Sequence, residues 1–283
     1  MLDLIKQNRV FAFAIASFIL IIGFGFIVPY FTRDPLDPIL DRFGTRVIFR
    51  PPSPNYILGT DDWGRDVFAQ LAHATRNSLE IGFVTGIMVA IIGVTIGTAA
   101  GYLGGWIDEI LMFLTNVVLV FPVFPMLLVL SAHLEERSMF MVAAILAITG
   151  WPWVARALRA QVLSLKEREF VNLSRVSGMS NIRIALAEIL PNMLAYIGLV
   201  IAIVTGGAIV AEAGISMLGL GPNPLVNPTL GGMLYWVIQN ESIRSNYYWL
   251  YFPPGIILTY FFVDLYILHR HMDELFNPRL RRR

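Results

Sequence analysis

The sequence predicts an all-α polytopic membrane protein with about six transmembrane helices. Its 283 residues are 56% hydrophobic and only 14% charged, and the mean hydropathy is +0.65. A soluble domain carries about 25% charged residues, most of them on the surface that faces water. The low charge therefore indicates that a lipid bilayer covers much of this chain.

Six stretches are apolar enough to cross the membrane, since a span of about 30 Å takes roughly 20 residues. They lie at residues 10–30, 81–107, 110–132, 138–155, 189–211 and 245–263. The first stretch is too long for the core of a signal peptide and lacks a small-residue cleavage site, so we interpret it as an uncleaved span.

Basic residues predict the orientation of these spans, because cytoplasmic loops carry an excess of lysine and arginine. Lys6 and Arg9 precede the first span, a basic segment from Arg156 to Arg183 separates the fourth from the fifth, and the tail ends in 281–283, all arginine. An even number of spans puts both termini on one side. The sequence therefore predicts that both termini and the segment between spans four and five are cytoplasmic.

The chain is predicted to divide into two parts. Residues 1–77 form an N-terminal transmembrane helix and an extracytoplasmic loop, in which Pro35, Pro38 and the prolines of 51–54 disfavour regular structure. Residues 78–283 form a five-helix core, which includes a cytoplasmic loop at about residues 157–190.

This cytoplasmic loop is too polar to span, and its apolar residues recur at loosely helical spacing on both sides of Gly178. Glycine can adopt a positive φ and end a helix. Ser180 can cap the helix that follows, and Pro191 marks its junction with the fifth span. The pattern predicts two short helices joined by a tight turn, although an ordinary loop lying on lipid headgroups fits the same periodicity.

Several functions are disfavoured by what the sequence lacks. The chain has no cysteine and therefore no disulfide or thiolate metal site. Neither of its two lysines, Lys6 and Lys166, stands in the Gly-Lys-Ser/Thr pattern of a phosphate-binding loop, and no His-Glu-x-x-His or Gly-x-Ser-x-Gly motif occurs. With a net charge of +1, nothing favours nucleic acid as a partner. We expect no catalytic residues, no metal and no cofactor bound by this chain.

Two acidic residues are predicted to lie close to the hydrocarbon region of the membrane. Placing a carboxylate there costs free energy, so each is a functional candidate by default. Glu212 lies roughly 30 Å along a helix that starts near Pro191, at ~1.5 Å per residue, which places it at the outer interface. This depth favours a structural or gating role over a proton relay. For Asp264 the sequence favours structural pairing with His269 or Arg270.

Glycines recur every four residues in the second span, at Gly93, Gly97 and Gly101. Such spacing lets helix backbones approach closely in a membrane. It predicts a tight helix interface, either within this chain or with a partner protein.

The loop carries a recognisable pattern. The stretch 164–178, Ser-Leu-Lys-Glu-Arg-Glu-Phe-Val-Asn-Leu-Ser-Arg-Val-Ser-Gly, followed by Glu-Ile-Leu-Pro-Asn at 188–192, resembles the coupling loop of ABC importer permeases. By this resemblance Asn172, Leu173, Ser174 and Gly178 occupy the Glu-Ala-Ala…Gly positions, and Pro191 belongs to the terminal Leu-Pro. The triplet departs from the family pattern, because the acidic residue is lost and leucine replaces a small alanine.

Further motifs extend the resemblance over nearly the whole chain. Leu-Gly-Thr-Asp-Asp-Trp-Gly-Arg-Asp at 58–66, Gly-Tyr-Leu-Gly-Gly-Trp-Ile-Asp at 101–108 and Asn-Pro-Arg-Leu at 277–280 are similar to the C-type subunit of dipeptide and oligopeptide permeases. The resemblance implies the fold of a type I ABC importer permease in the cytoplasmic membrane.

The resemblance also implies partners and substrates. The partners are a B-type permease homologue, two cytoplasmic ATPase subunits that bind ATP and Mg, and an extracytoplasmic substrate-binding protein. The substrates are di- or oligopeptides, or else oligosaccharides or nickel carried by the same machinery. A rival class, the ion-coupled secondary transporter, often has midplane charges, and this chain has almost none.

Overall fold

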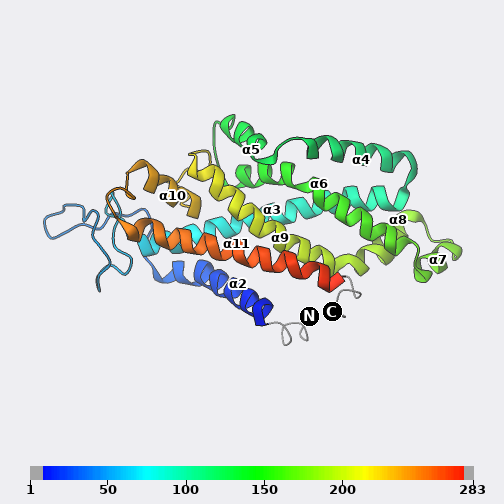
Figure 1. Cartoon of the computed structure of the whole chain (residues 1–283), viewed down its shortest axis with the longest axis horizontal. Coiled ribbons are helices and arrows are strands. Elements are labelled where there is room, and N and C mark those ends of the chain that lie inside the picture. The colour runs from blue at the N-terminus through cyan, green and yellow to red at the C-terminus, as the bar shows by residue number, and fades with distance from the viewer. Residues whose placement is uncertain (1–8, 277–283) are drawn as a thin grey trace. The chain divides into compact units, whose positions relative to one another are not determined.

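Helices make up most of the computed structural model, which describes residues 9–276, with the side chains of 9–11, 265 and 268–276 excepted (Figure 1). The basic residues Lys6 and 281–283 and the motif at 277–280 lie outside the described residues. In order, the elements are α2 (Arg9–Ile27), η1 (Val28–Phe31), α3 (Val67–Leu103), α4 (Gly105–Val120), α5 (Val123–Ala132), α6 (Met139–Lys166), α7 (Glu169–Val176), α8 (Asn181–Ile184), the π-helical turn η2 (Ala185–Ile189), α9 (Leu190–Met217), α10 (Leu230–Gln239) and α11 (Tyr248–Phe276).

Four helical stretches are long and apolar enough to cross a membrane: Ala12–Phe31, Val67–Leu103, Met139–Lys166 and Asn181–Met217. The pair α4 and α5 would be a fifth span if it crosses as one broken helix. The predicted all-α membrane class is thus confirmed. The count of six spans and the cytoplasmic location of the termini stay predictions.

The third predicted span, 110–132, is not one straight helix, and whether it crosses the membrane as one broken span stays a prediction. The structure bends it by 82° between α4 and α5. Phe121 has an extended backbone (φ −74°, ψ 134°), as the residue before a proline prefers, and Pro122 cannot donate a helical hydrogen bond. Hydropathy alone does not predict this break, because the residues on both sides of it are apolar.

The second span begins earlier than predicted, at Val67 instead of residue 81. Asp66 caps this helix, since its Oδ1 accepts hydrogen bonds from the backbone N–H of Phe68 (2.8 Å) and Ala69 (3.4 Å). The first turns carry charge, including an Arg76–Glu80 pair at 2.8 Å. These charged residues excluded the start of α3 from the apolar stretch.

The chain forms two compact units, each with its own apolar core. Unit 1 comprises residues 1–82, 131–142 and 206–283, and its core includes Val67, Ile209 and Phe261. Unit 2 comprises residues 83–130 and 143–205, with a separate core. The boundary expected at residue 77 stays a prediction.

The glycine run of α3 lies in unit 2 and packs against α6 of the same chain. A Cβ added at Gly97 would lie 2.7 Å from the carbonyl oxygen of Ala155 and 3.0 Å from the backbone nitrogen of Arg159. At Gly93 it would meet Val154, and at Gly101 it would meet Val162. The three glycines therefore allow close approach of two helices within the chain.

We expect Gly97→Leu to destabilise the protein by about 1–3 kcal/mol, because the side chain would push against backbone atoms that cannot rotate away. Gly198→Leu is the matched control, since nothing lies within 4 Å of a Cβ at that helical glycine. Thermal unfolding in detergent measures both variants. Equal melting temperatures would contradict the packing described for α3 and α6.

Candidate functional site

The segment with the coupling-loop pattern folds around the short helix α7. Glu169 in its first turn and Arg175 in its last complement the helix dipole. Its Val171 is fully buried and packs in the core of unit 2, with Phe170 partly buried beside it. One face of α7 is therefore anchored in the protein.

The opposite face of α7 is exposed and apolar. Leu173 is 68% exposed and Val176 is 88% exposed, and Ile182 beyond the turn is 72% exposed. Asn172 is also exposed, and its Oδ1 accepts a hydrogen bond from Arg175 Nη1 at 3.2 Å. Ser174 is half-buried. Exposed apolar side chains gathered in this way are typical of a binding surface.

Gly178 ends α7 in a turn that depends on its backbone. Its φ is +79°, its N–H donates to the carbonyl of Arg175 (3.1 Å), and the N–H of Met179 donates to the carbonyl of Ser174 (3.1 Å). This is the Schellman arrangement, in which glycine is preferred because other residues rarely adopt a left-handed conformation. Nothing lies within 4 Å of a Cβ built at Gly178, so the glycine is required for its φ and not for space.

The second half of the segment differs from the prediction of a separate short helix. α8 continues through the π-helical turn η2 into α9, so that Asn181–Met217 is one helical stretch. Ser180 stands at the N-cap of α8, but its side chain makes no capping hydrogen bond, so that part of the prediction is wrong. The π turn precedes Pro191, whose missing N–H and bulky ring disturb the regular hydrogen-bond pattern.

Glu212 lies at the centre of a buried polar network in unit 1. Its side chain is fully buried, and its carboxylate accepts hydrogen bonds from the hydroxyls of Ser216 (2.5 Å), Thr229 (2.7 Å) and Ser78 (3.2 Å). Ser78 Oγ in turn accepts from the backbone N–H of Leu230 at 3.1 Å. The network joins α3, α9 and the first turn of α10.

The sequence analysis predicted neither the hydrogen-bond partners of Glu212 nor the helix α10. Thr229 caps α10, since its Oγ1 accepts a hydrogen bond from the N–H of Gly232 at 3.1 Å. A threonine directly before the apolar run 230–238 is a helix-start signal that would have found this helix. Ser78 carries no such signal, because its role depends on a residue 134 positions away.

Asp264 lies in α11 and is 1% exposed. Its Oδ1 accepts a hydrogen bond from Ser17 Oγ of α2 at 2.7 Å, while no described residue bonds its Oδ2. The side chains of its expected partners, His269 and Arg270, lie outside the described residues. Phe18 and Phe261 also meet edge to face at 6.3 Å, so α2 and α11 pack together in unit 1.

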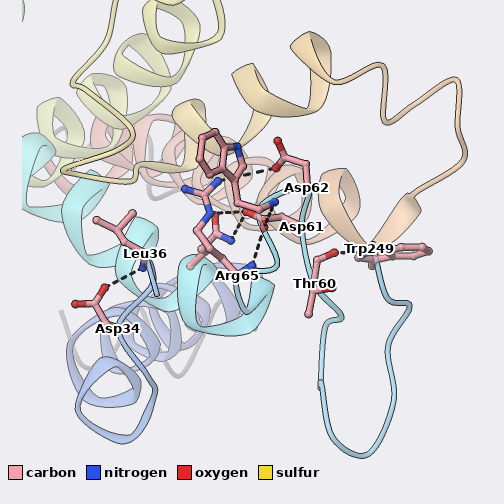
Figure 2. A network of polar contacts seen from close by, with 9 residues as sticks. Asp34, Leu36, Thr60, Asp61, Asp62, Arg65 and Trp249 are labelled. Carbon is pink, nitrogen blue, oxygen red and sulfur yellow. Dashed lines mark hydrogen bonds and ion pairs between the residues drawn. The ribbon is translucent and has the colours of Figure 1, made fainter. Parts of the chain in front are cut away.

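The motif at 58–66 forms a second polar network, shown in Figure 2. Asp61 is the acceptor at its centre: Oδ1 accepts from the backbone of Trp63 and Arg65, and Oδ2 from Arg65 Nε (2.7 Å) and Gln70 Nε2 (2.9 Å). Trp249 Nε1 donates to the carbonyl of Thr60 at 3.2 Å. The motif therefore fastens the long first loop to α3 and α11.

Asp62 stands beside this network with a raised pKa. Burial is the main cause, and the neighbouring carboxylate of Asp61 adds to it, while Arg65 acts in the opposite direction. Among the described residues, no group of three or more histidine or carboxylate side chains could hold a metal ion.

Comparison with known proteins connects these features to a family. The family described as binding-protein-dependent transport system inner membrane component matches residues 93–282. The dipeptide transport system permease protein DppC of Bacillus subtilis (strain 168) is 32% identical over 236 residues, 82% of this chain and 71% of the relative.

Two further relatives align over almost the entire chain. The oligopeptide transport system permease protein OppC of Bacillus subtilis (strain 168) is 29% identical over 283 residues, 98% of this chain and 88% of the relative. OppC of Mycobacterium tuberculosis (strain ATCC 25618 / H37Rv) is 29% identical over 278 residues, 97% of this chain and 92% of the relative. The resemblance to ABC importer permeases is thus confirmed, and the chain belongs to the family of binding-protein-dependent transport system inner membrane components.

Proposed function

We propose that this chain is the permease subunit of an ATP-driven importer for di- or oligopeptides in the cytoplasmic membrane. The relatives that align over most of the chain are named as oligopeptide and dipeptide permeases. The chain contributes the path across the membrane and the mechanical link to its energy source. ATP hydrolysis takes place on two separate ATPase subunits, which hold ATP and Mg.

The exposed apolar face of α7 is the observation that carries the coupling part of this proposal. Leu173 and Val176 project from a short helix whose other face is anchored by Val171. An amphipathic helix of this kind fits a groove on a partner protein. Leu173 stands where the family pattern has a small alanine, and it enlarges the exposed apolar surface of α7. We therefore expect the partner ATPase to have a correspondingly wider groove.

The connections of α7 suggest how motion passes into the spans. α6 ends at Lys166, just before α7, and the helical stretch Asn181–Met217 begins three residues after Gly178. Because no loop interrupts that stretch, a displacement of the Gly178 turn moves the start of α9 with it. The π turn at Ala185–Ile189 interrupts the regular hydrogen-bond ladder of this connection, so we expect the connection to deform there.

The remaining partners follow from the proposal. A B-type permease homologue completes the path, and an extracytoplasmic binding protein delivers the substrate. Closure of the ATPases turns the spans outward to receive substrate, and their reopening turns the path inward. This chain performs no bond-making step.

Transport by the complete importer tests the proposal. The chain, its B-type homologue, both ATPases and the binding protein are reconstituted in vesicles, and uptake of a radiolabelled tripeptide is measured with and without ATP. We expect ATP-dependent uptake that an ionophore does not reduce. Uptake of nickel or an oligosaccharide but no peptide would overturn the substrate, and uptake that follows an ion gradient without ATP would overturn the class.

A further inference from the structure

A cavity of about 590 Å³ lies in unit 1, where the connection from α5 to α6 meets the connection from α9 to α10. Sites for small molecules commonly measure about 300–1,000 Å³ and combine apolar walls with a few polar groups. The lining residues with charged, amide or aromatic side chains include 135–137, Asn223, Asn227, Tyr235 and Trp236. The cavity therefore has the size and the mixed lining of a small-molecule site.

Hydrogen bonds join the two connections that form the cavity. Arg137 Nη1 donates to the carbonyl of Gly219 at 2.6 Å, and the N–H of Asn223 donates to the carbonyl of Arg137 at 3.4 Å. Gly219 also permits close approach of α10, because a Cβ at this position would lie 2.9 Å from the ring of Tyr235. The cavity is therefore a defined part of the fold.

Two carboxylates line this cavity without a partner. Glu135 and Glu136 are exposed, and neither makes an ion pair or a hydrogen bond with another residue in the described part of the chain. The cation beside them, Arg137, is bound to the backbone of Gly219. These three charged side chains together carry one negative charge, so the cavity favours a cationic ligand.

Two aromatic side chains line the cavity from α10. Tyr235 and Trp236 meet edge to face, with 5.5 Å between the ring centroids. Aromatic rings attract the cations of ligands, as in the cages that bind quaternary ammonium groups. Carboxylates and aromatic rings around one cavity are therefore a combination that suits an ammonium group and disfavours a phosphate.

The cavity lies at the end of unit 1 that carries the first loop. Trp236 also lines a second, small cavity of about 30 Å³, together with Asp61 and Asp62 of the 58–66 motif. The loop that contains this motif is predicted to be extracytoplasmic. A substrate that arrives from outside the membrane therefore reaches this end of unit 1 first.

We propose that the cavity binds the N-terminal ammonium of an arriving peptide, with Glu135 and Glu136 as counter-charges. The proposal rests on the proposed function, for which it names the group of the substrate that this chain recognises. Peptides of any sequence carry this ammonium, whereas a neutral oligosaccharide does not. A docked protein fits less well, because a specific protein interface buries about 1,200–2,000 Å² of surface and this site is a cavity of small-molecule size.

The absence of cysteine makes a direct binding test practical, because Val226→Cys introduces the only thiol of this chain, at an exposed position that lines the cavity. A fluorophore on this thiol is monitored in the membrane complex of both permeases and both ATPases, whose other subunits carry no reactive cysteine. The binding protein is left out so that it does not compete for peptide. We expect trialanine to change the fluorescence at lower concentration than N-acetyl-trialanine, which lacks the ammonium.

Substitution of the carboxylates tests their role. The double variant Glu135→Gln, Glu136→Gln should weaken the binding of trialanine about fivefold, the upper range for an exposed charge pair, and leave the binding of N-acetyl-trialanine unchanged. Glu241→Gln is the matched control, because Glu241 is exposed, pairs with Arg244 at 3.3 Å and does not line the cavity. This control should bind both peptides as the unchanged chain does.

Equal affinities of the unchanged chain for the two peptides would overturn the proposal, and so would a double variant that binds trialanine as tightly as before. A crosslink from the introduced thiol to the binding protein that saturating trialanine does not reduce would assign the cavity to protein docking instead. The fluorescence is read without ATP and without transport. ATP-dependent peptide uptake with no preference for the free amine would therefore reject the site alone, whereas this preference without peptide uptake would reject the importer function alone.

Discussion

Gly178→Val is expected to reduce peptide uptake by about tenfold or more while the protein still inserts into the membrane. Gly178 has a φ of +79°, where a β-branched residue is strained by about 1–2 kcal/mol. Valine would shift the turn and with it the direction of α7 and the position of Leu173. ATP hydrolysis by the importer should then no longer respond to the loaded binding protein.

Two further substitutions of Gly178 distinguish the effect of backbone conformation on uptake from the effect of side-chain size. Asparagine tolerates the left-handed region better than alanine, and space at Gly178 is open. We therefore expect Gly178→Asn to retain more uptake than the smaller Gly178→Ala. If uptake followed side-chain volume instead, the required φ would not be the reason for glycine here.

Gly44→Val is the matched control for the valine variant. Gly44 lies in the first loop with a φ of +76° and nothing within 4 Å of a Cβ, so it imposes the same strain without touching α7. Peptide uptake by the Gly44→Val variant should stay near that of the unchanged chain. Normal uptake in Gly178→Val, measured at equal membrane levels, would refute docking through this turn.

Glu212→Ala is expected to destabilise the protein by about 3 kcal/mol or more. The substitution removes the acceptor for the hydroxyls of Ser78, Ser216 and Thr229 in a site without solvent exposure. Each buried polar group left without a partner costs about 1–3 kcal/mol. Thermal unfolding and the yield of monodisperse protein measure this loss.

Two comparisons sharpen the prediction for Glu212. Glu212→Gln keeps one acceptor oxygen but replaces the other by an amide donor. Its melting temperature should therefore fall between that of Glu212→Ala and that of the unchanged chain. Glu80→Gln is the control, because Glu80 pairs with Arg76 on a half-exposed face and such pairs contribute ~0–1 kcal/mol. A melting temperature of Glu212→Ala equal to that of Glu80→Gln would contradict the buried network.

Peptide uptake by Glu212→Gln also distinguishes a structural role of Glu212 from a role as a proton relay. If Glu212 only holds α3, α9 and α10 together, the uptake per folded importer should be similar in Glu212→Gln and the unchanged chain. A proton relay would instead require the titratable carboxylate, and uptake by Glu212→Gln would fall even where the protein is fully folded. The three hydroxyl donors favour the structural role.

Local patterns in the sequence determined the class of this protein. Hydropathy depends on neighbouring residues alone, so it predicted the membrane helices, and the basic amphipathic segment around Gly178 could be located from spacing and composition. The positive φ of Gly178 was predictable for the same reason, because a helix end is decided within a few residues. The lack of a phosphate-binding loop around either lysine was likewise visible without a structure.

Only the tertiary structure decided which residues meet. The start of α3 at Val67 has a local signal in the cap at Asp66, but the charged side chains that follow, including Arg76 and Glu80, kept these turns out of the span that hydropathy predicts. The 82° bend between α4 and α5 lies at Pro122 within a continuous apolar stretch, and the size of this bend is known only from the structure. Ser78 and Glu212 lie 134 residues apart, and Lys166 and Tyr102 come from different helices. Such contacts depend on how helices pack, and a single sequence carries no record of that packing.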